Sequence, residues 1–195
     1  MDCYNTRAEY EAARQELRNE IRNYESQSGH SLTQSERLAL IDAGLRGATL
    51  ETVQQPGGNY TLTAYNSSND QIFYQAGIIT PNSLGKGTGT DSESRQYAKD
   101  CAAQSNYPNP IEYGHITGKN EGGGGSVSDR NGFPQSRHVN RGDMRTFQSE
   151  LHKHADRTGQ TVQTFTQLVY ANPNTVPTSI KIYTNIMSSP KILPN

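Results

Sequence analysis

Tryptophan, long apolar runs and a surplus of either charge are all missing from this sequence of 195 residues. Only 31% of the residues are hydrophobic, whereas glycine and proline number 18 and 9, so we expect a modest core and extensive loops. No run approaches the ~18 apolar residues that a membrane span needs, and the first residues lack the apolar stretch of a signal peptide. The sequence therefore predicts a protein without a membrane segment.

Cysteine is scarce as well, with only Cys3 and Cys101. Two cysteines are too few for a disulfide framework, and no Cys-x-x-Cys or Cys/His cluster indicates a zinc site. Free thiols are favoured, although a pairing in an oxidising compartment stays open. Lysine and arginine number 18 against 19 aspartate and glutamate, so the net charge gives no general attraction to a polyanion. Composition alone does not indicate a nucleic-acid partner.

Two helices are predicted at the start of the chain. Apolar residues recur at helical spacing between Tyr10 and Tyr24, and charged residues fill the other faces. A second helix is expected from Thr33, because Thr33 and Glu36 form a capping-box pattern. These patterns predict a helical hairpin over the first 50 residues, and we expect an N-terminal helical region over residues 1–55 and a second domain over 56–195.

Strand-like alternation replaces helical spacing after the break at Gln55–Gly58. The other expected elements are a β-hairpin over 60–79, polar loops over 80–94 and around Gly122–Gly125, a helix from Asn140 that ends before Thr158, and strands over 161–170 and 179–184 joined by a turn at 172–174. This order of elements predicts an α+β fold with an antiparallel sheet.

Three short motifs occur in order in the second half of the chain. Gly114-His115 comes first, Asn131 follows with Pro134-Gln135, and Asn140 stands nine residues after Asn131 and before Gly142. Each motif alone is weak, because a lone histidine is usually structural and Asn140 could be an ordinary N-cap supported by Asp143. Together, their order and spacing are fairly specific.

This arrangement resembles the DNA/RNA non-specific endonuclease family of ββα-metal, or His-Me finger, nucleases. The pair Gly122-Gly123 is similar to the branch found as bacterial toxin domains, and the resemblance covers roughly residues 95–186. It implies a ββα-metal motif, an antiparallel sheet and a metal-dependent endonuclease that cuts DNA, RNA or both and leaves 5′-phosphate ends.

The chemistry of His115 and Asn140 suits such a site. A neutral imidazole at His115 accepts a proton from water near the phosphorus, which is the general-base role that the resemblance implies. The amide oxygen of Asn140 is a suitable ligand for Mg²⁺, which keeps several waters and also binds phosphate oxygens. On a helix, Asn140 shares a face with the apolar residues Met144, Phe147 and Leu151, so it is expected to point at the sheet.

The remaining site residues are expected around this pair. The resemblance implies that Asn131 holds the catalytic loop, and that Gln148 stands where a glutamate often holds metal-bound water, so we expect weakened metal affinity. Glu112 and Tyr113 replace the family's Asp-Arg pair before Gly-His. With that arginine missing, transition-state charge would be balanced by Arg141 first, with Lys119, Arg137 and Gly114 as further substrate contacts.

The resemblance to the toxin branch also implies a location and a partner. It implies secretion or delivery into a target cell, and a cognate immunity protein in the producer. Two alternatives stay open: a binding module whose catalysis has decayed, and an HNH-group nuclease in which His138 adds a second metal ligand. His152 and His154 lie two residues apart on the expected helix, face different sides, and are expected in solvent.

Overall fold

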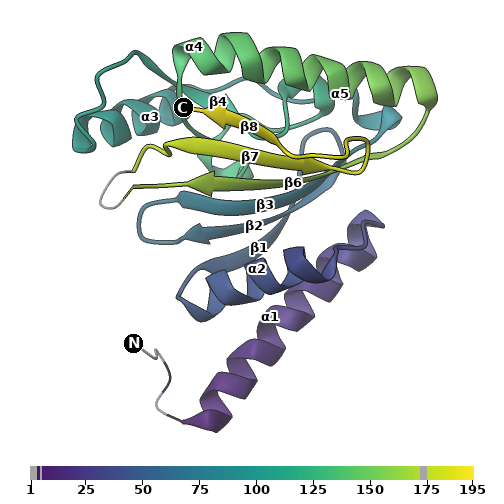
Figure 1. Cartoon of the computed structure of the whole chain (residues 1–195), viewed down its shortest axis with the longest axis vertical. Coiled ribbons are helices and arrows are strands. Elements are labelled where there is room, and N and C mark those ends of the chain that lie inside the picture. The colour runs from purple at the N-terminus through teal and green to yellow at the C-terminus, as the bar shows by residue number, and fades with distance from the viewer. Residues whose placement is uncertain (1–3, 5, 172–174) are drawn as a thin grey trace.

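A computed structural model describes residues 4, 6–171 and 175–195 of the chain. The fold is α+β, with a six-stranded antiparallel sheet between two groups of helices (Figure 1). Helices α1 and α2 lie below the sheet in that view, and α3, α4 and α5 lie above it with a small two-stranded sheet. No helix in the described part of the chain is long and apolar enough to cross a membrane.

The two expected N-terminal helices are present. Helix α1 spans Arg7–Ser28 and α2 spans Gln34–Leu45. Their starts are fixed by capping boxes, and the one at α2 is the predicted pair, in which the Thr33 hydroxyl accepts from Glu36 N and the Glu36 carboxylate accepts from Thr33 N. Residues of both helices share one core cluster with residues of the large sheet, so these helices cover one face of that sheet.

The large sheet contains the expected hairpin and closing strands together with two strands that the sequence did not reveal. In order across the sheet its strands are β1 (Thr49–Gln54), β2 (Tyr60–Asn66), β3 (Gln71–Ile79), β6 (Val162–Val169), β7 (Ser179–Thr184) and β8 (Lys191–Pro194). Strand β1 lies in the stretch assigned to the helical region, and the expected division at residue 55 falls in the turn between two paired strands. The turn expected at 172–174 lies outside the described residues.

The other face of the sheet carries the second core cluster. It joins α5 (Arg145–Thr158) and a hairpin of β4 (Ile111–His115) and β5 (Gly132–Ser136) to the large sheet. Met144, Phe147 and Leu151 are buried in this cluster, as the helical spacing predicted. Cys101 is buried as a free thiol, whereas Cys3 lies outside the described residues.

Two sequence predictions in this layer were wrong. Residues 80–94 are not all loop, because a 3₁₀ turn forms at Pro81–Ser83 and α3 (Ser92–Gln104) begins within them, capped by the Asp91 side chain. The helix expected from Asn140 begins earlier, at α4 (Arg137–Val139), where the Ser136 side chain accepts from Val139 N. A π-helical turn over Asn140–Met144 then leads into α5. Asn140 is therefore not the N-cap.

Candidate active site

His115 lies at the end of β4, where its backbone pairs with Gly132 of β5. Its ring is half-buried, and Nε2 lies 3.0 Å from the carbonyl oxygen of Thr88. A carbonyl oxygen only accepts, so Nε2 carries the proton and a neutral ring leaves Nδ1 as the acceptor. Burial, the largest effect, lowers the pKa of His115 below its usual value. The imidazole is therefore neutral at pH 7 and suited to accept a proton through Nδ1.

Thr88 is held rigidly by the loop that follows β4. Its backbone N–H donates to Gly123 O at 3.1 Å, and its hydroxyl accepts from Gly125 N at 3.1 Å. A Cβ on the neighbouring Gly87 would lie 2.3 Å from Lys119 O, so only glycine permits this approach of two backbones. The segment assigned to a polar loop thus fixes the tautomer of His115.

Glu112 joins β4 to the start of the helix. Asn140 Nδ2 donates to Glu112 Oε2 at 2.9 Å, and Arg141 Nε donates to the same oxygen at 3.1 Å. Arg137 adds a weaker contact, with Nε 3.5 Å from Glu112 Oε1. Burial alone would raise the pKa of Glu112, but the hydrogen bonds from Arg141 and Asn140 hold that pKa below its usual range. Glu112 is therefore ionised at neutral pH.

The amide of Asn140 has a defined orientation because a carboxylate accepts only. Nδ2 must face Glu112, so Oδ1 points away from it and has no hydrogen-bond donor among the described residues. The Asn140 amide oxygen and the Glu112 carboxylate are the hard oxygen donors that Mg²⁺ prefers. No three His, Cys, Asp or Glu side chains gather as a metal site within the described ranges. The donors present fit an oxygen-seeking ion that keeps most of its waters.

Asn131 holds the loop between β4 and β5. The side chain is fully buried; Oδ1 accepts from Thr117 N at 2.9 Å, and Nδ2 donates to Thr117 O at 2.8 Å and to Gly124 O at 2.9 Å. Its own backbone oxygen accepts from Ile116 N at 2.7 Å. These bonds fix the backbone directly after His115, and a part of Asn131 in catalysis stays a prediction.

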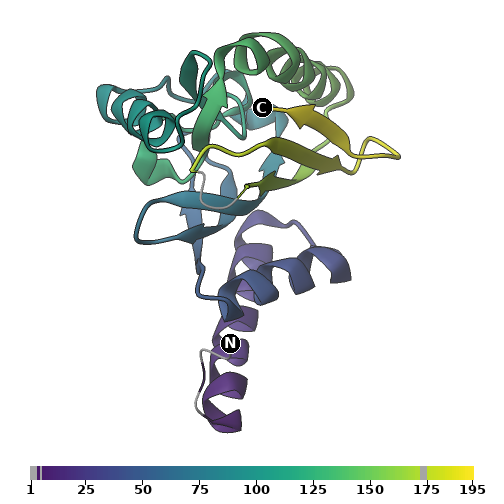
Figure 2. The same cartoon turned by 60° about the vertical axis from the view of Figure 1, so that its left-hand side comes forward.

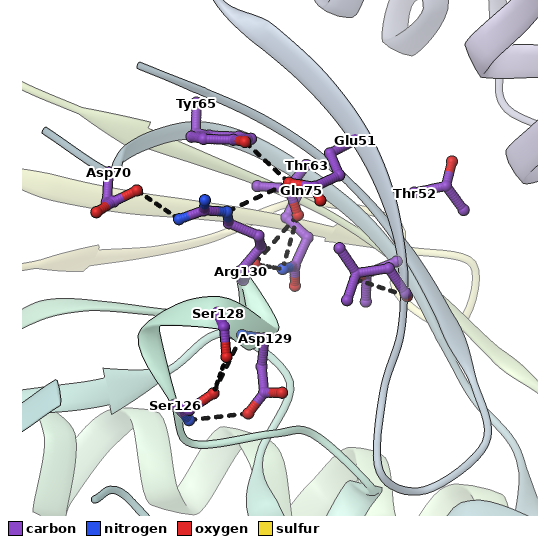
Figure 3. A network of polar contacts seen from close by, with 12 residues as sticks. Glu51, Thr52, Thr63, Tyr65, Asp70, Gln75, Ser126, Ser128, Asp129 and Arg130 are labelled. Atoms are coloured by element: carbon purple, nitrogen blue, oxygen red, sulfur yellow. Dashed lines mark hydrogen bonds and ion pairs between the residues drawn. The ribbon is translucent and has the colours of Figure 1, made fainter. Parts of the chain in front are cut away.

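Arg130 ties this loop to the large sheet (Figure 3). Its guanidinium pairs with Glu51 and Asp70 and lies 4.1 Å from the centre of the Tyr65 ring. Its backbone oxygen accepts from the Gln75 amide at 2.6 Å and from the Thr63 hydroxyl, and its φ of 51° is the left-handed conformation. The residue before Asn131 is thus anchored from two sides.

Gln148 contacts the backbone at the end of β4, which carries His115. Its Nε2 donates to His115 O at 3.0 Å and lies 3.4 Å from Ile116 O. Gln148 is not among the residues that line the cleft described below. The structure gives this amide a positioning task, and its contact with metal-bound water stays a prediction.

Gln148→Glu is expected to destabilise the protein rather than to tighten metal binding. A carboxylate cannot donate, so it would face two carbonyl oxygens that lose their partner, at a cost of about 1–3 kcal/mol. Urea unfolding of the variant and of Gln148→Met checks this, and both should lose stability because both remove the donor. A Gln148→Glu protein that unfolds at the wild-type urea concentration would contradict a stabilising role for the hydrogen bonds from Gln148 to His115 O and Ile116 O.

A cleft of about 320 Å³ brings the candidate residues together. Glu112, His115, Asn140 and Arg141 line it from β4 and the helix start, and Thr90, Arg95 and Lys99 line it from α3 and the residue before its cap. The last three were missed by the motif reasoning. Two features of the sequence could have indicated helix α3: Asp91 is a suitable N-cap, and Ala98 and Cys101 form an apolar stripe.

The other predicted substrate contacts lie outside this cleft. Gly114 is buried, and a Cβ there would lie 2.0 Å from Gln135 Oε1, so the glycine at this position allows close packing of the Gln135 side chain. Lys119 is exposed nearby, and its charge also lowers the pKa of His115. Tyr113, where the family has arginine, is 4% exposed and packs against Gly132 and α3, so an arginine there would be buried.

The remaining histidines do not join His115. His138 is exposed and lines a separate cavity of about 800 Å³ with Arg137 and Arg141. The prediction that His152 is solvated was wrong, because its Nδ1 lies 3.3 Å from Oε1 of Glu121, a carboxylate that is 3% exposed. His154 is half-buried as well.

Sequence comparison shows that part of this chain is similar to a known protein. No family model matches this chain. A protein named probable deoxyribonuclease RhsA, from Dickeya dadantii (strain 3937), is 30% identical over 118 residues. The match covers 60% of this chain but only 8% of that protein. The chain is therefore similar to a small part of a protein that is named as a deoxyribonuclease.

One solved structure, described as "Structure of Sda1 nuclease with bound zinc ion", has a TM-score of 0.48 and 12% identity with this chain. The similarity covers 74% of this chain and 82% of that chain. At this level of likeness, its zinc ion carries no implication for the residues described above.

Proposed function

We propose that this protein is a metal-dependent endonuclease that hydrolyses phosphodiester bonds in DNA, in RNA or in both. One observation carries the proposal: a histidine with a fixed tautomer lines the same cleft as an asparagine amide, an ionised carboxylate and an arginine. The β4-β5 hairpin followed by the helix supports a ββα-metal site, and the similarity to part of a deoxyribonuclease supports DNA as a substrate.

In this mechanism, His115 Nδ1 takes a proton from the attacking water. The Asn140 amide oxygen, which faces away from Glu112, would hold the ion, and Glu112 would orient that amide. Arg141 would exchange its carboxylate partner for a phosphate oxygen. When bound, such an ion would supply positive charge against the negative charge on the phosphate and on the departing 3′ oxygen. Gln148 and Asn131 fix the backbone at the catalytic histidine and directly after it.

Removal of divalent metal tests the proposed activity. Supercoiled plasmid and total RNA are incubated with the protein in Mg²⁺, in Mn²⁺ and in EDTA, and the products are separated on gels. Nicked or shortened nucleic acid is expected with either metal and intact substrate with EDTA, because the proposed hydrolysis depends on a divalent ion at the phosphate. Intact substrate under every condition would leave the decayed binding module as the better interpretation.

The biological setting is a separate part of the proposal. Resemblance to the toxin branch supports delivery into a competitor cell and neutralisation by a cognate immunity protein in the producer. The similarity to a segment that makes up 8% of a longer protein is consistent with one nuclease module in a large delivered chain.

A further inference from the structure

Helix α3 forms a wall of the cleft that the three motifs do not include. Arg95 and Lys99 lie one helical turn apart, so their side chains emerge from the same side of the helix. Both side chains are exposed, whereas Ser94, Ala98 and Cys101 of the same helix are buried. The helix thus packs one face against the protein and turns two cations toward the cleft.

The contacts of α3 fix these cations relative to His115. The Ser94 hydroxyl donates to Gly125 O at 2.8 Å, in the loop that also holds Thr88. Further along the helix, the Tyr97 ring meets the Tyr113 ring edge to face, with centres 6.1 Å apart. Tyr113 lies two residues before His115 on β4, so α3 packs directly against the strand that carries His115.

Arg95 and Lys99 differ in their partners from Arg141 in the cleft and from Arg137 beside it. Arg141 pairs with Glu112, and Arg137 lies 3.5 Å from the same carboxylate. Neither Arg95 nor Lys99 forms a salt bridge with any carboxylate of the described residues. Asp91, the N-cap of α3, acts on Arg95 only through its charge at longer range. Within the described residues, the cleft therefore presents two positive charges that no salt bridge holds, beside a candidate phosphodiester site.

The lining favours recognition of the phosphate backbone over recognition of bases. Tyr113 is the aromatic residue in the lining, and at 4% exposure its ring cannot stack on a base. We propose that Arg95 and Lys99 bind the phosphates next to the bond that is aligned on His115. This inference rests on the proposed nuclease function and specifies how its substrate is held.

Binding at several salt concentrations tests the proposal without cleavage. A fluorescein-labelled DNA duplex is titrated with protein in EDTA, and the dissociation constant is obtained from anisotropy between 50 and 200 mM NaCl. Removing two phosphate contacts is expected to lower the slope of log affinity against log salt by about 1.8. Arg95→Gln with Lys99→Gln should show this loss, with binding weaker by roughly 10–100-fold at 50 mM salt.

Two control variants test whether a loss of binding comes from lost phosphate contacts at positions 95 and 99 or from the change in net charge or in fold. Arg18→Gln with Arg22→Gln removes the same charge at the same spacing from exposed positions on α1, which lies across the sheet from α3 in Figures 1 and 2. This control should keep the wild-type slope. Arg95→Lys with Lys99→Arg keeps both charges and should also keep it.

The outcomes distinguish this inference from the proposed function. A wild-type protein that binds and cuts DNA, with an unchanged slope in the α3 glutamine variant, overturns the role of Arg95 and Lys99 alone. An equal loss in the α1 control overturns it too, because net charge then explains the effect. A wild-type protein that neither binds nor cuts nucleic acid overturns both the inference and the proposed function.

Discussion

His115→Ala is expected to lower the rate of DNA cleavage by about 10²–10⁴-fold, the usual effect of losing a general base. No other imidazole lines the cleft, and the neighbouring carboxylate is occupied by Arg141 and Asn140, so the described residues offer no replacement base. The half-buried ring makes one hydrogen bond, to Thr88 O, so the fold should survive its removal. Initial rates on supercoiled plasmid, with thermal unfolding as a check on the fold, measure both effects.

His138→Ala is the matched control for that variant. His138 is exposed and lines the neighbouring cavity, so its removal should leave the rate near that of the wild type. A rate that falls equally in both variants would favour the HNH alternative, in which His138 binds the metal. A His115→Ala enzyme within tenfold of the wild type would contradict the general-base role.

The elements that the sequence predicted well are those whose signals are local. The Thr33-Glu36 capping box and the spacing of apolar residues in α1 depend on residues within one or two helical turns. Strand β7 was also placed correctly, because its β-branched and aromatic residues alternate between the faces of the sheet. The motif residues His115 and Asn140 line one cleft, and their roles in catalysis and in metal binding stay predictions.

The missed elements depend on contacts between distant segments. Helix α3 is polar except for a narrow stripe, and its packing requires Tyr113 and Gly125, which come later in the chain. Thr88 lies in a stretch rich in glycine and serine, and nothing local shows that its carbonyl meets the ring of His115. Strand β1 was also missed, because its pairing with β2, and not a pattern in its own residues, defines it as a strand.

Glu112 shows how a departure from a family pattern acquires a physical role. On the sequence alone it was a substitution that weakened the resemblance. In the structure it accepts hydrogen bonds from Asn140 and Arg141, and so it sets the direction of the Asn140 amide oxygen. In the proposed site, a carboxylate would therefore lie beside the residue that supplies the amide ligand, which would lessen the need for an acidic residue at position 148.

Asn140→Ala should lower metal-dependent cleavage by on the order of 100-fold or more, since losing even an outer contact of a metal site typically costs 10–100-fold. The variant loses the amide oxygen that faces away from Glu112, and the Mg²⁺ concentration for half-maximal rate should rise. Rates measured against Mg²⁺ concentration, together with calorimetric titration of Mn²⁺, report the two effects separately.

The stability of the Asn140→Ala variant distinguishes a metal-binding role of Asn140 from a helix-capping role. If Asn140 were the N-cap, its removal would cost about 0.5–2 kcal/mol of folding free energy. Because Ser136 caps the helix, Asn140→Ala should unfold close to the wild-type temperature while activity is lost. Asn140→Asp keeps an oxygen ligand but sets a second carboxylate against Glu112, so it should retain more metal-dependent cleavage than the alanine variant while unfolding at a lower temperature. A destabilised alanine variant with wild-type metal affinity would mean that Asn140 supports the helix and does not bind the ion.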